Sequence, residues 1–187
     1  PDLVIAVGGG AVLDYAKILN VLQDDENLEE KIKNKRIYTN KKNFFLIALP
    51  TTAGSGAEVT SNAVIYVGDI KYSIEGENIK PDNFFLISDL ILTNPKKLKS
   101  SSGFDAIAQA IESLLSIKSN NESVKFALES LKISTKNYLN FIKSPNKENS
   151  SSMLIAANLA GKAINISKTT APHAVSYPFT SLFNISH

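Results

Sequence analysis

The fold is decided by residues 3–17, Leu3-Val-Ile-Ala-Val-Gly8-Gly9-Gly10-Ala11-Val-Leu-Asp14-Tyr-Ala-Lys17. Leu3 to Val7 is a short apolar run ended by glycines, a pattern typical of a parallel strand buried on both faces. From Ala11 to Leu22 apolar residues recur at helical spacing. Strand, glycine turn and helix together favour phosphate binding, because glycines let the backbone approach a phosphate and the helix offers free N–H groups. A plain strand-to-helix turn is the alternative.

Further strands follow this unit along the chain. Phe44 to Leu49 predicts a second buried strand, and Phe84 to Ile87 predicts another short one. Val64 to Val67 and Tyr72 to Ile74 flank Gly-Asp and predict a hairpin. The charged residues 24–42 predict a solvated helix end or loop.

After Pro95 the pattern becomes helical, with Ala, Leu and Ile at three- and four-residue spacing. The predicted helices cover residues 102–117, 122–142 and 152–166, and a polar turn at 95–101 precedes them. We therefore predict an α/β plus all-α fold. Its two domains are a partial Rossmann-like nucleotide-binding half, residues 1–96, and a helical half, residues 97–187.

Composition excludes several classes of partner. The net charge is only +2 and 20% of residues are charged, which argues against a nucleic-acid or membrane partner. The sequence contains no cysteine, so disulfides and thiolate metal ligands are excluded. No apolar run approaches the roughly 18 residues of a membrane span. We expect a soluble cytoplasmic protein.

Both ends of the sequence look cut. The first residues, from Pro1, predict a central strand and not an outer first one, and the chain closes directly on His187. We therefore expect an internal fragment, with a crossover unit missing before the first strand and helices missing at the other end.

Glycines and hydroxyls are concentrated in Pro50-Thr51-Thr52-Ala53-Gly54-Ser55-Gly56-Ala57-Glu58-Val59-Thr60. Threonine hydroxyls suit ribose and phosphate oxygens, and the glycines permit close approach. The alternative is a loop whose hydroxyls bond its own backbone.

Two histidines, His173 and His187, are the only ones in the chain. They would bind a metal if Asp105 and Gln109 met them in space, since these two residues share one face of a predicted helix. Two structural readings compete with this one. Ser102 and Asp105 also have the spacing of a capping box, and an isolated histidine is usually structural.

Four motifs together resemble the iron-containing (group III) alcohol dehydrogenase family. Residues 8–17 resemble its Gly-Gly-Gly-Ser-x-x-Asp-x-Ala-Lys, and residues 50–60 resemble its Pro-Thr-Thr-Ala-Gly-Thr-Gly-Ser-Glu-Val-Thr. Residues 103–112 are similar to its Gly-x-Asp-Ala-x-x-His-Ala-x-Glu. The spacing in sequence between His173 and His187 matches the spacing between the family's last two metal ligands. The resemblance implies a dehydroquinate synthase-like architecture.

The resemblance also implies roles for particular residues. A nicotinamide cofactor, NAD or NADP, would lie on the α/β half, and the helical half would hold a divalent metal, iron or zinc. Metal ligands would be Asp105, Gln109, His173 and His187. Cofactor contacts would be Gly9, Gly10, Ala11, Asp14, Thr51, Thr52, Ser55, Asn62 and Lys71.

Two positions depart from the family pattern. Gln109 replaces a histidine, and its neutral amide oxygen is a weaker donor to iron or zinc. Tyr177 replaces a histidine that relays protons near the alcohol, and its hydroxyl is the predicted catalytic proton donor. Both departures resemble members that reduce phosphonoacetaldehyde. Lys162 and Lys168 are candidate lysines for such an anionic substrate.

Three functions follow from these observations. The first is metal-assisted, NAD(P)-linked reduction of a small aldehyde to an alcohol. The second is nucleotide binding by a metal-poor relative without turnover, which Gln109 and Tyr177 suggest. The third is a reaction of the related dehydroquinate synthase or glycerol-1-phosphate dehydrogenase type. Family members commonly associate, so a homodimer is an expected form.

Overall fold

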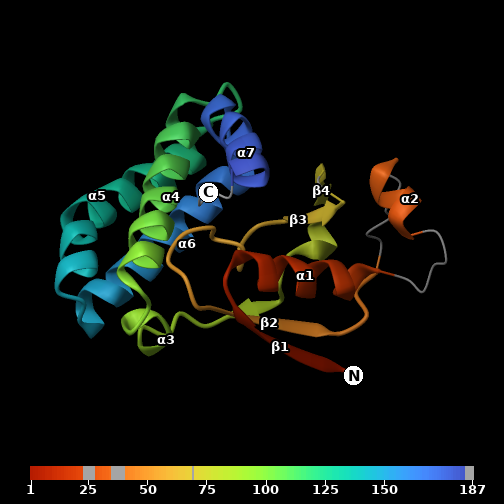
Figure 1. The fold of residues 1–187 in the computed structure, drawn as a ribbon, viewed down its shortest axis with the longest axis horizontal. Helices are drawn as coiled ribbons and strands as arrows, with labels where there is room; N and C mark the ends of the chain where they lie inside the picture. The colour runs from red at the N-terminus through yellow and green to blue at the C-terminus, as the bar shows by residue number, and fades with distance from the viewer. Residues whose placement is uncertain (23–27, 35–40, 69, 184–187) are drawn as a thin grey trace.

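The computed structural model describes residues 1–22, 28–34, 41–68 and 70–183, with a strand-containing part followed by helices (Figure 1). The first part contains β1 (Leu3–Gly8), α1 (Gly10–Val21), α2 (Leu28–Lys33), β2 (Phe45–Pro50), β3 (Asn62–Val67), β4 (Ile70–Glu75), the 3-10 helix η1 (Glu77–Ile79), β5 (Asn83–Phe84) and α3 (Asp89–Leu92). The second contains α4 (Lys96–Leu115), α5 (Asn121–Lys143), α6 (Lys147–Ser167) and α7 (Ala171–Phe183). The predicted α/β plus all-α fold class is confirmed, and the division into two domains stays a prediction.

A parallel sheet aligns the two predicted loops. Within the described residues its strand order is β1-β2-β5, and Gly8 of β1 pairs with Pro50 of β2. The glycine turn after β1 and the hydroxyl-rich loop after β2 therefore leave the same edge of the sheet side by side. The predicted hairpin is also present, as the antiparallel pair β3–β4.

Only one face of β1 is covered. Ala6 packs with Leu13 of α1 and with Leu46 and Ala48 of β2 in a buried cluster. On the other face Leu3, Ile5 and Val7 are 50%, 56% and 49% exposed. The prediction that this strand is buried on both faces is therefore wrong for the chain as it stands.

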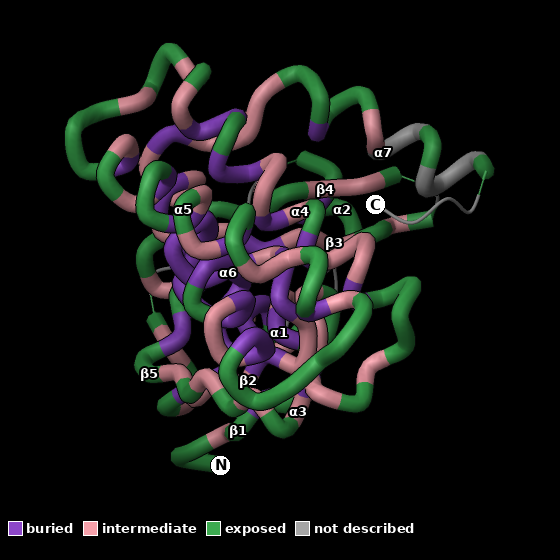
Figure 2. Tube along the Cα trace, turned by 90° about the vertical axis from the view of Figure 1, so that its left-hand side faces the viewer, coloured by how far each residue is buried: buried purple, intermediate pink, exposed green. Residues whose placement is uncertain are grey.

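Helices α4, α5 and α6 pack around small side chains. Ala106, Ala110, Ala127, Ala157 and Ala160 are all buried in their common core, and buried segments concentrate between these helices (Figure 2). Small residues allow close helix approach, as interior packing density requires. Asn120 and Asn146 begin α5 and α6 with reciprocal capping boxes.

Helix α4 begins earlier than the sequence predicted. The polar turn expected at residues 95–101 is instead its first turns, since the helix starts directly after Pro95. Ser102 lies inside the helix and its hydroxyl donates to Leu98 O at 2.7 Å, so the capping-box interpretation of Asp105 is wrong. The early start escaped prediction because Lys96 to Ser102 lacks an apolar stripe.

Other boundaries differ less. Helix α6 begins five residues before its predicted start at Ser152, and β5 is shorter than its prediction. In the charged stretch 24–42 the structure contains α2, while residues 23–27 and 35–40 lie outside the described part. None of the described helices is long and apolar enough to cross a bilayer.

The loop after β2 joins the sheet to the helices. Ala53 packs into the helical core and Ala57 into the sheet core. Gly56, with φ of 60°, lies against Gly161 of α6, where a Cβ on Gly56 would be 2.5 Å from Gly161 Cα. Ser61 N also donates to Asn165 Oδ1 at 2.7 Å. This loop therefore fixes the position of the helices relative to the strands.

Candidate active site

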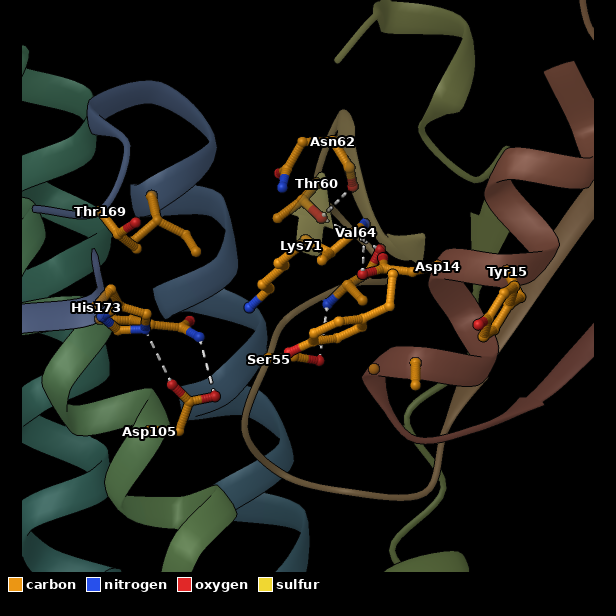
Figure 3. Close-up of a pocket in the computed structure, with 16 residues that line it drawn as sticks. Asp14, Tyr15, Ser55, Thr60, Asn62, Val64, Lys71, Asp105, Thr169 and His173 are labelled. Carbon is orange, nitrogen blue, oxygen red and sulfur yellow. Dashed lines mark hydrogen bonds and ion pairs between the residues drawn. The ribbon is translucent and has the colours of Figure 1, made fainter. Parts of the chain in front are cut away.

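A pocket of about 420 Å³ lies where the strand-containing part meets the helices (Figure 3). It brings together nine of the predicted site residues: Gly10, Ala11, Asp14, Ser55, Asn62, Lys71, Asp105, Gln109 and His173. Two further lining residues, Ala57 and Thr60, belong to the loop 50–60 that the sequence indicated. The remaining ones, which the sequence did not indicate, are Tyr15, Val64, Tyr66, Ile164 and Thr169.

One end of the pocket is the first turn of α1. The helix starts at Gly10, and no side chain caps its first turn. A Cβ on Gly10 would lie 2.8 Å from Ser55 Oγ and 3.0 Å from Ser55 Cβ, so any larger residue here would force Ser55 to shift. Uncapped N–H groups at a helix N-terminus attract anions. This end of the pocket suits a phosphate.

Asp14 faces the pocket, but its carboxylate already has protein partners. Oδ2 accepts the Val64 N–H at 3.0 Å, and Oδ1 lies 3.3 Å from Lys17 Nζ. Burial raises the pKa of Asp14, although Lys17 and the Val64 N–H oppose the shift. Asp14 and Lys17 are therefore paired with each other inside the protein.

Lys17 is a buried link between segments. Its side chain is completely buried, and Nζ donates to Ala57 O at 3.0 Å, Thr60 Oγ1 at 2.9 Å and Asn62 O at 2.5 Å. These bonds tie α1 to the loop after β2 and to the start of β3. Burial lowers the pKa of Lys17, and the charge of Asp14 opposes the shift.

Three predicted cofactor residues do not line this pocket. Gly9 and Thr52 face each other, since a Cβ on Gly9 would be 3.4 Å from Thr52 Cγ2. Thr51 donates its N–H to Gly8 O at 2.9 Å and accepts from Asn94 Nδ2 at 2.8 Å, so its backbone joins the two turns.

Asn62 and Lys71 come from the β3–β4 hairpin. Figure 3 shows the Lys71 side chain between Asp14 on one side and Asp105 on the other. Burial lowers the pKa of Lys71, and the charges of Asp14 and Asp105 partly oppose this shift. The hairpin thus brings a cation into the middle of the pocket.

At the helical end, Asp105 lies between two predicted ligands. Its Oδ1 is 3.2 Å from His173 Nε2, and its Oδ2 accepts from Gln109 Nε2 at 3.1 Å (Figure 3). Burial lowers the pKa of His173, but the hydrogen bonds to Asp105 and Glu112 outweigh it and raise the pKa. The predicted convergence of Asp105, Gln109 and His173 is present in the structure.

These side chains are chemically suited to a divalent cation. Gln109 Oε1 is buried and has no hydrogen-bond partner among the described residues, which is costly for a polar atom. Turning the amide would point this oxygen at Asp105, and two oxygens face each other favourably only with a cation between them. No three His, Asp or Glu side chains of the described part form a metal-binding group, so the amide would be the third donor.

Glu112 is a site residue that the sequence analysis did not single out. Its Oε1 lies 2.5 Å from His173 Nδ1, and its Oε2 accepts the N–H and O–H of Thr170 at 2.6 and 2.9 Å. Its spacing gave a signal, because Asp105, Gln109 and Glu112 follow one another at four and three residues on one face of α4.

The remaining predicted residues have different outcomes. Tyr177 is one turn after His173 in α7, although its side chain lies outside the described part, as does His187 entirely.

The structure contradicts the anion-site assignments of Lys162 and Lys168. Lys162 Nζ lies over the rings of Phe84 and Phe126, and Lys168 pairs with Glu75 at 3.1 Å, so neither lysine lines the pocket.

Comparison with known proteins agrees with this geometry. The sequence matches the family "Iron-containing alcohol dehydrogenase" over residues 1–88 and "Fe-containing alcohol dehydrogenase family, C-terminal" over residues 99–187. A 4-hydroxybutyrate dehydrogenase of Clostridium kluyveri is 30% identical over 98% of this chain and 50% of its own length. A phosphonoacetaldehyde reductase of Streptomyces viridochromogenes is 27% identical over 100% of this chain and 49% of its own length.

A solved structure shows the same fold. The sulfoacetaldehyde reductase of Bifidobacterium kashiwanohense, in complex with NAD+, superposes with a TM-score of 0.90 at 31% identity, covering 100% of this chain and 50% of that one. The chain spans about half the length of the relatives it matches. Matches to both parts of the family, together with this fold, show that the chain belongs to the iron-containing alcohol dehydrogenases.

Proposed function

We propose that this chain serves an NAD(P)-linked alcohol dehydrogenase that reduces a small aldehyde at a divalent metal, iron or zinc. The observation that carries the proposal is the pocket itself. One end is the uncapped start of α1, suited to a phosphate, and the other is the cluster of Asp105, Gln109 and His173. A cofactor and a metal would therefore be neighbours.

At the cofactor end, the N–H groups of Gly10 and Ala11 would bind the pyrophosphate. Ser55 and Asn62 would offer hydrogen bonds to the ribose and nicotinamide side, and Lys71 would supply a positive charge to a phosphate oxygen. Gly9, Thr51 and Thr52 remain proposed contacts at the edge of this region. Asp14 would act indirectly, because it holds the backbone of Val64.

At the metal end, Asp105, Gln109 and His173 would hold the cation, with His187 as a proposed fourth ligand. The metal would supply Lewis-acid polarisation of the substrate carbonyl, and the nicotinamide cofactor would supply the hydride. Tyr177, one helical turn after His173, would donate the proton that the alcohol oxygen requires. Ile164 and Val64 would keep water away from this region.

For the substrate we propose a short aldehyde with an anionic group, phosphonoacetaldehyde being the specific case. Two similar proteins are named for anionic aldehydes, phosphonoacetaldehyde and sulfoacetaldehyde. Lys162 and Lys168 do not line the pocket, and Lys71, the lysine that does, is assigned above to the cofactor, so the anionic substrate is proposed from these relatives alone.

A second candidate function is nucleotide binding without turnover. It is favoured by the amide of Gln109, which bonds directly to Asp105 where the family pattern has a histidine. The family assignment, in contrast, supports the alcohol dehydrogenase reaction over the dehydroquinate synthase and glycerol-1-phosphate dehydrogenase alternatives.

The test combines metal analysis with cofactor binding. We expect the purified chain to bind one equivalent of Fe²⁺ or Zn²⁺ and to enhance NAD(P)H fluorescence, and Asp105→Ala to lose the metal but keep the cofactor. Asp89→Ala, which removes an exposed carboxylate paired with Lys147, is the matched control. Cofactor binding without metal in the native chain would favour the second candidate. Aldehyde assays with phosphonoacetaldehyde and butanal would then test the substrate.

A further inference from the structure

Glu112 lies behind His173, on the side away from the pocket. It is 4% exposed and does not line the pocket, yet it lies one helical turn beyond Gln109 on the same face of α4. It makes hydrogen bonds to the His173 ring and to Thr170, which directly precedes α7. The carboxylate therefore touches the ring of a proposed metal ligand from the opposite side.

The chemistry of these contacts fixes which ring nitrogen carries the proton. An ionised carboxylate accepts hydrogen bonds and donates none. Glu112 Oε1 lies 2.5 Å from His173 Nδ1, closer than the 3.2 Å between Asp105 Oδ1 and His173 Nε2, and Asp105 also accepts from Gln109. Glu112 therefore holds the hydrogen on Nδ1, and when a cation displaces the hydrogen from Nε2, the Nε2 lone pair faces the pocket.

Thr170 keeps the carboxylate in place. Its N–H and O–H both donate to Oε2, at 2.6 and 2.9 Å, so Oε1 remains for the ring. The same contacts attach the start of α7 to α4. These contacts together restrict rotation of the His173 ring, of the Glu112 carboxylate and of the start of α7.

We propose that Glu112 is a positioning residue that holds His173 in the Nδ1–H tautomer and directs Nε2 toward Asp105 and the cation. This inference rests on the proposed metal site and deepens it. Hydrogen-bonded carboxylates behind histidine ligands orient the ring and raise its donor strength, and their loss typically weakens metal affinity about 10- to 100-fold.

The test compares Glu112→Gln with Thr170→Val. Glutamine keeps the size of the side chain but presents an amide that donates as well as accepts, so the tautomer is no longer fixed. Valine removes one hydroxyl bond to Oε2 and leaves the backbone N–H and the His173 contact intact. A purely structural role of the cluster would show in both variants as lowered thermal stability.

The readouts are ¹⁵N NMR of labelled histidine and direct titration with Zn²⁺. The chain has only two histidines, and a His187→Gln variant assigns their signals. At a pH above the raised pKa of His173, where the metal-free ring is neutral, we expect the Nδ1–H tautomer in the native chain and in Thr170→Val, and a mixture of tautomers in Glu112→Gln. The Zn²⁺ affinities of the native chain and Thr170→Val should lie within about threefold of each other, and Glu112→Gln should lose about tenfold in affinity.

Native tautomer and native affinity in Glu112→Gln would overturn the inference. Failure of the proposed function looks different, because the native chain would then take up no Zn²⁺ at all. The tautomer of the metal-free ring still decides the role of Glu112 in that case. Retention of Nδ1–H in the native chain and its loss in Glu112→Gln would support the positioning role, and an unchanged tautomer would refute it.

Discussion

Gly56 and Gly161 meet backbone to backbone where the loop after β2 crosses α6. A Cβ added to Gly161 would lie 2.8 Å from both Cα and O of Gly56 and 2.9 Å from Val59 Cγ2. Backbone atoms cannot move aside as a flexible side chain can. The position of the helices relative to the sheet thus depends on two residues that lack side chains.

Gly161→Ala should therefore destabilise the chain, although alanine favours a helix. The helix-propensity gain of about 1 kcal/mol is offset by overpacking, and we expect a net loss of about 2 kcal/mol in the free energy of unfolding. Urea unfolding measures it. Gly68→Ala is the control, since a Cβ there meets nothing within 4 Å and costs only the strain of its positive φ, about 1 kcal/mol. Equal effects of both variants would contradict the close contact.

Lys17→Met should cost about 3 kcal/mol of stability, because the buried acceptors of the Lys17 ammonium lose their donor and the partly buried Asp14 carboxylate loses its cationic partner. Lys33→Met removes an exposed lysine paired with Glu29 and should leave the stability nearly unchanged. Urea unfolding of both variants gives the comparison. A loss below about 1 kcal/mol in Lys17→Met would show that this network contributes little.

Gln109→His should tighten Zn²⁺ binding by about tenfold, since imidazole is a better donor to zinc than an amide oxygen. Competition titration with a chromogenic chelator measures the affinity. Gln109→Met, of similar size but without an oxygen donor, should bind Zn²⁺ more weakly than the native chain. If the histidine variant bound no more tightly than the methionine variant, position 109 would not face the cation.

The stabilising effect of His173 in the metal-free chain should depend on pH. Its pKa is raised in the folded protein, because the bonds to Asp105 and Glu112 outweigh burial. A histidine whose pKa is raised by folding stabilises the protein fully below its ordinary pKa of 6.5. This stabilisation is lost as the pH rises through the pKa that the group has in the folded protein.

The stability difference between native chain and His173→Asn should consequently be larger at about pH 5.5 than at about pH 9. Urea unfolding in the presence of a chelator measures both differences. An equal difference at the two pH values would mean that the ring is not held as a cation between the carboxylates.

Glycine and proline residues at the ends of strands and in turns made most of the fold predictable. Gly8 to Gly10 and Pro50 marked the ends of β1 and β2, and the hairpin was predicted from its central glycine. The start of α4 was not predictable in the same way. Its first turns carry lysines and serines, and Lys99 is held by a bond to Leu92 O that no local pattern reveals.

The candidate site was predictable where motifs lie on one element and less so where contacts cross the chain. Asp105 and Gln109 share a helix face, so their proximity followed from spacing. Glu112 contacts His173 across 61 residues of sequence, a pairing that only the fold defines. Lys162 and Lys168 were misassigned because composition does not indicate on which side of a helix or linker a lysine lies.

One edge and one face of β1 are open within the described residues. Within the described residues β1 is an edge strand, so one row of its backbone N–H and C=O groups has no strand partner, and Leu3, Ile5 and Val7 beside it are about half exposed. Such an edge is a template for pairing with another chain. A further strand at this edge, from another segment of a longer chain or from a partner, would cover both the unpaired backbone groups and the three apolar side chains.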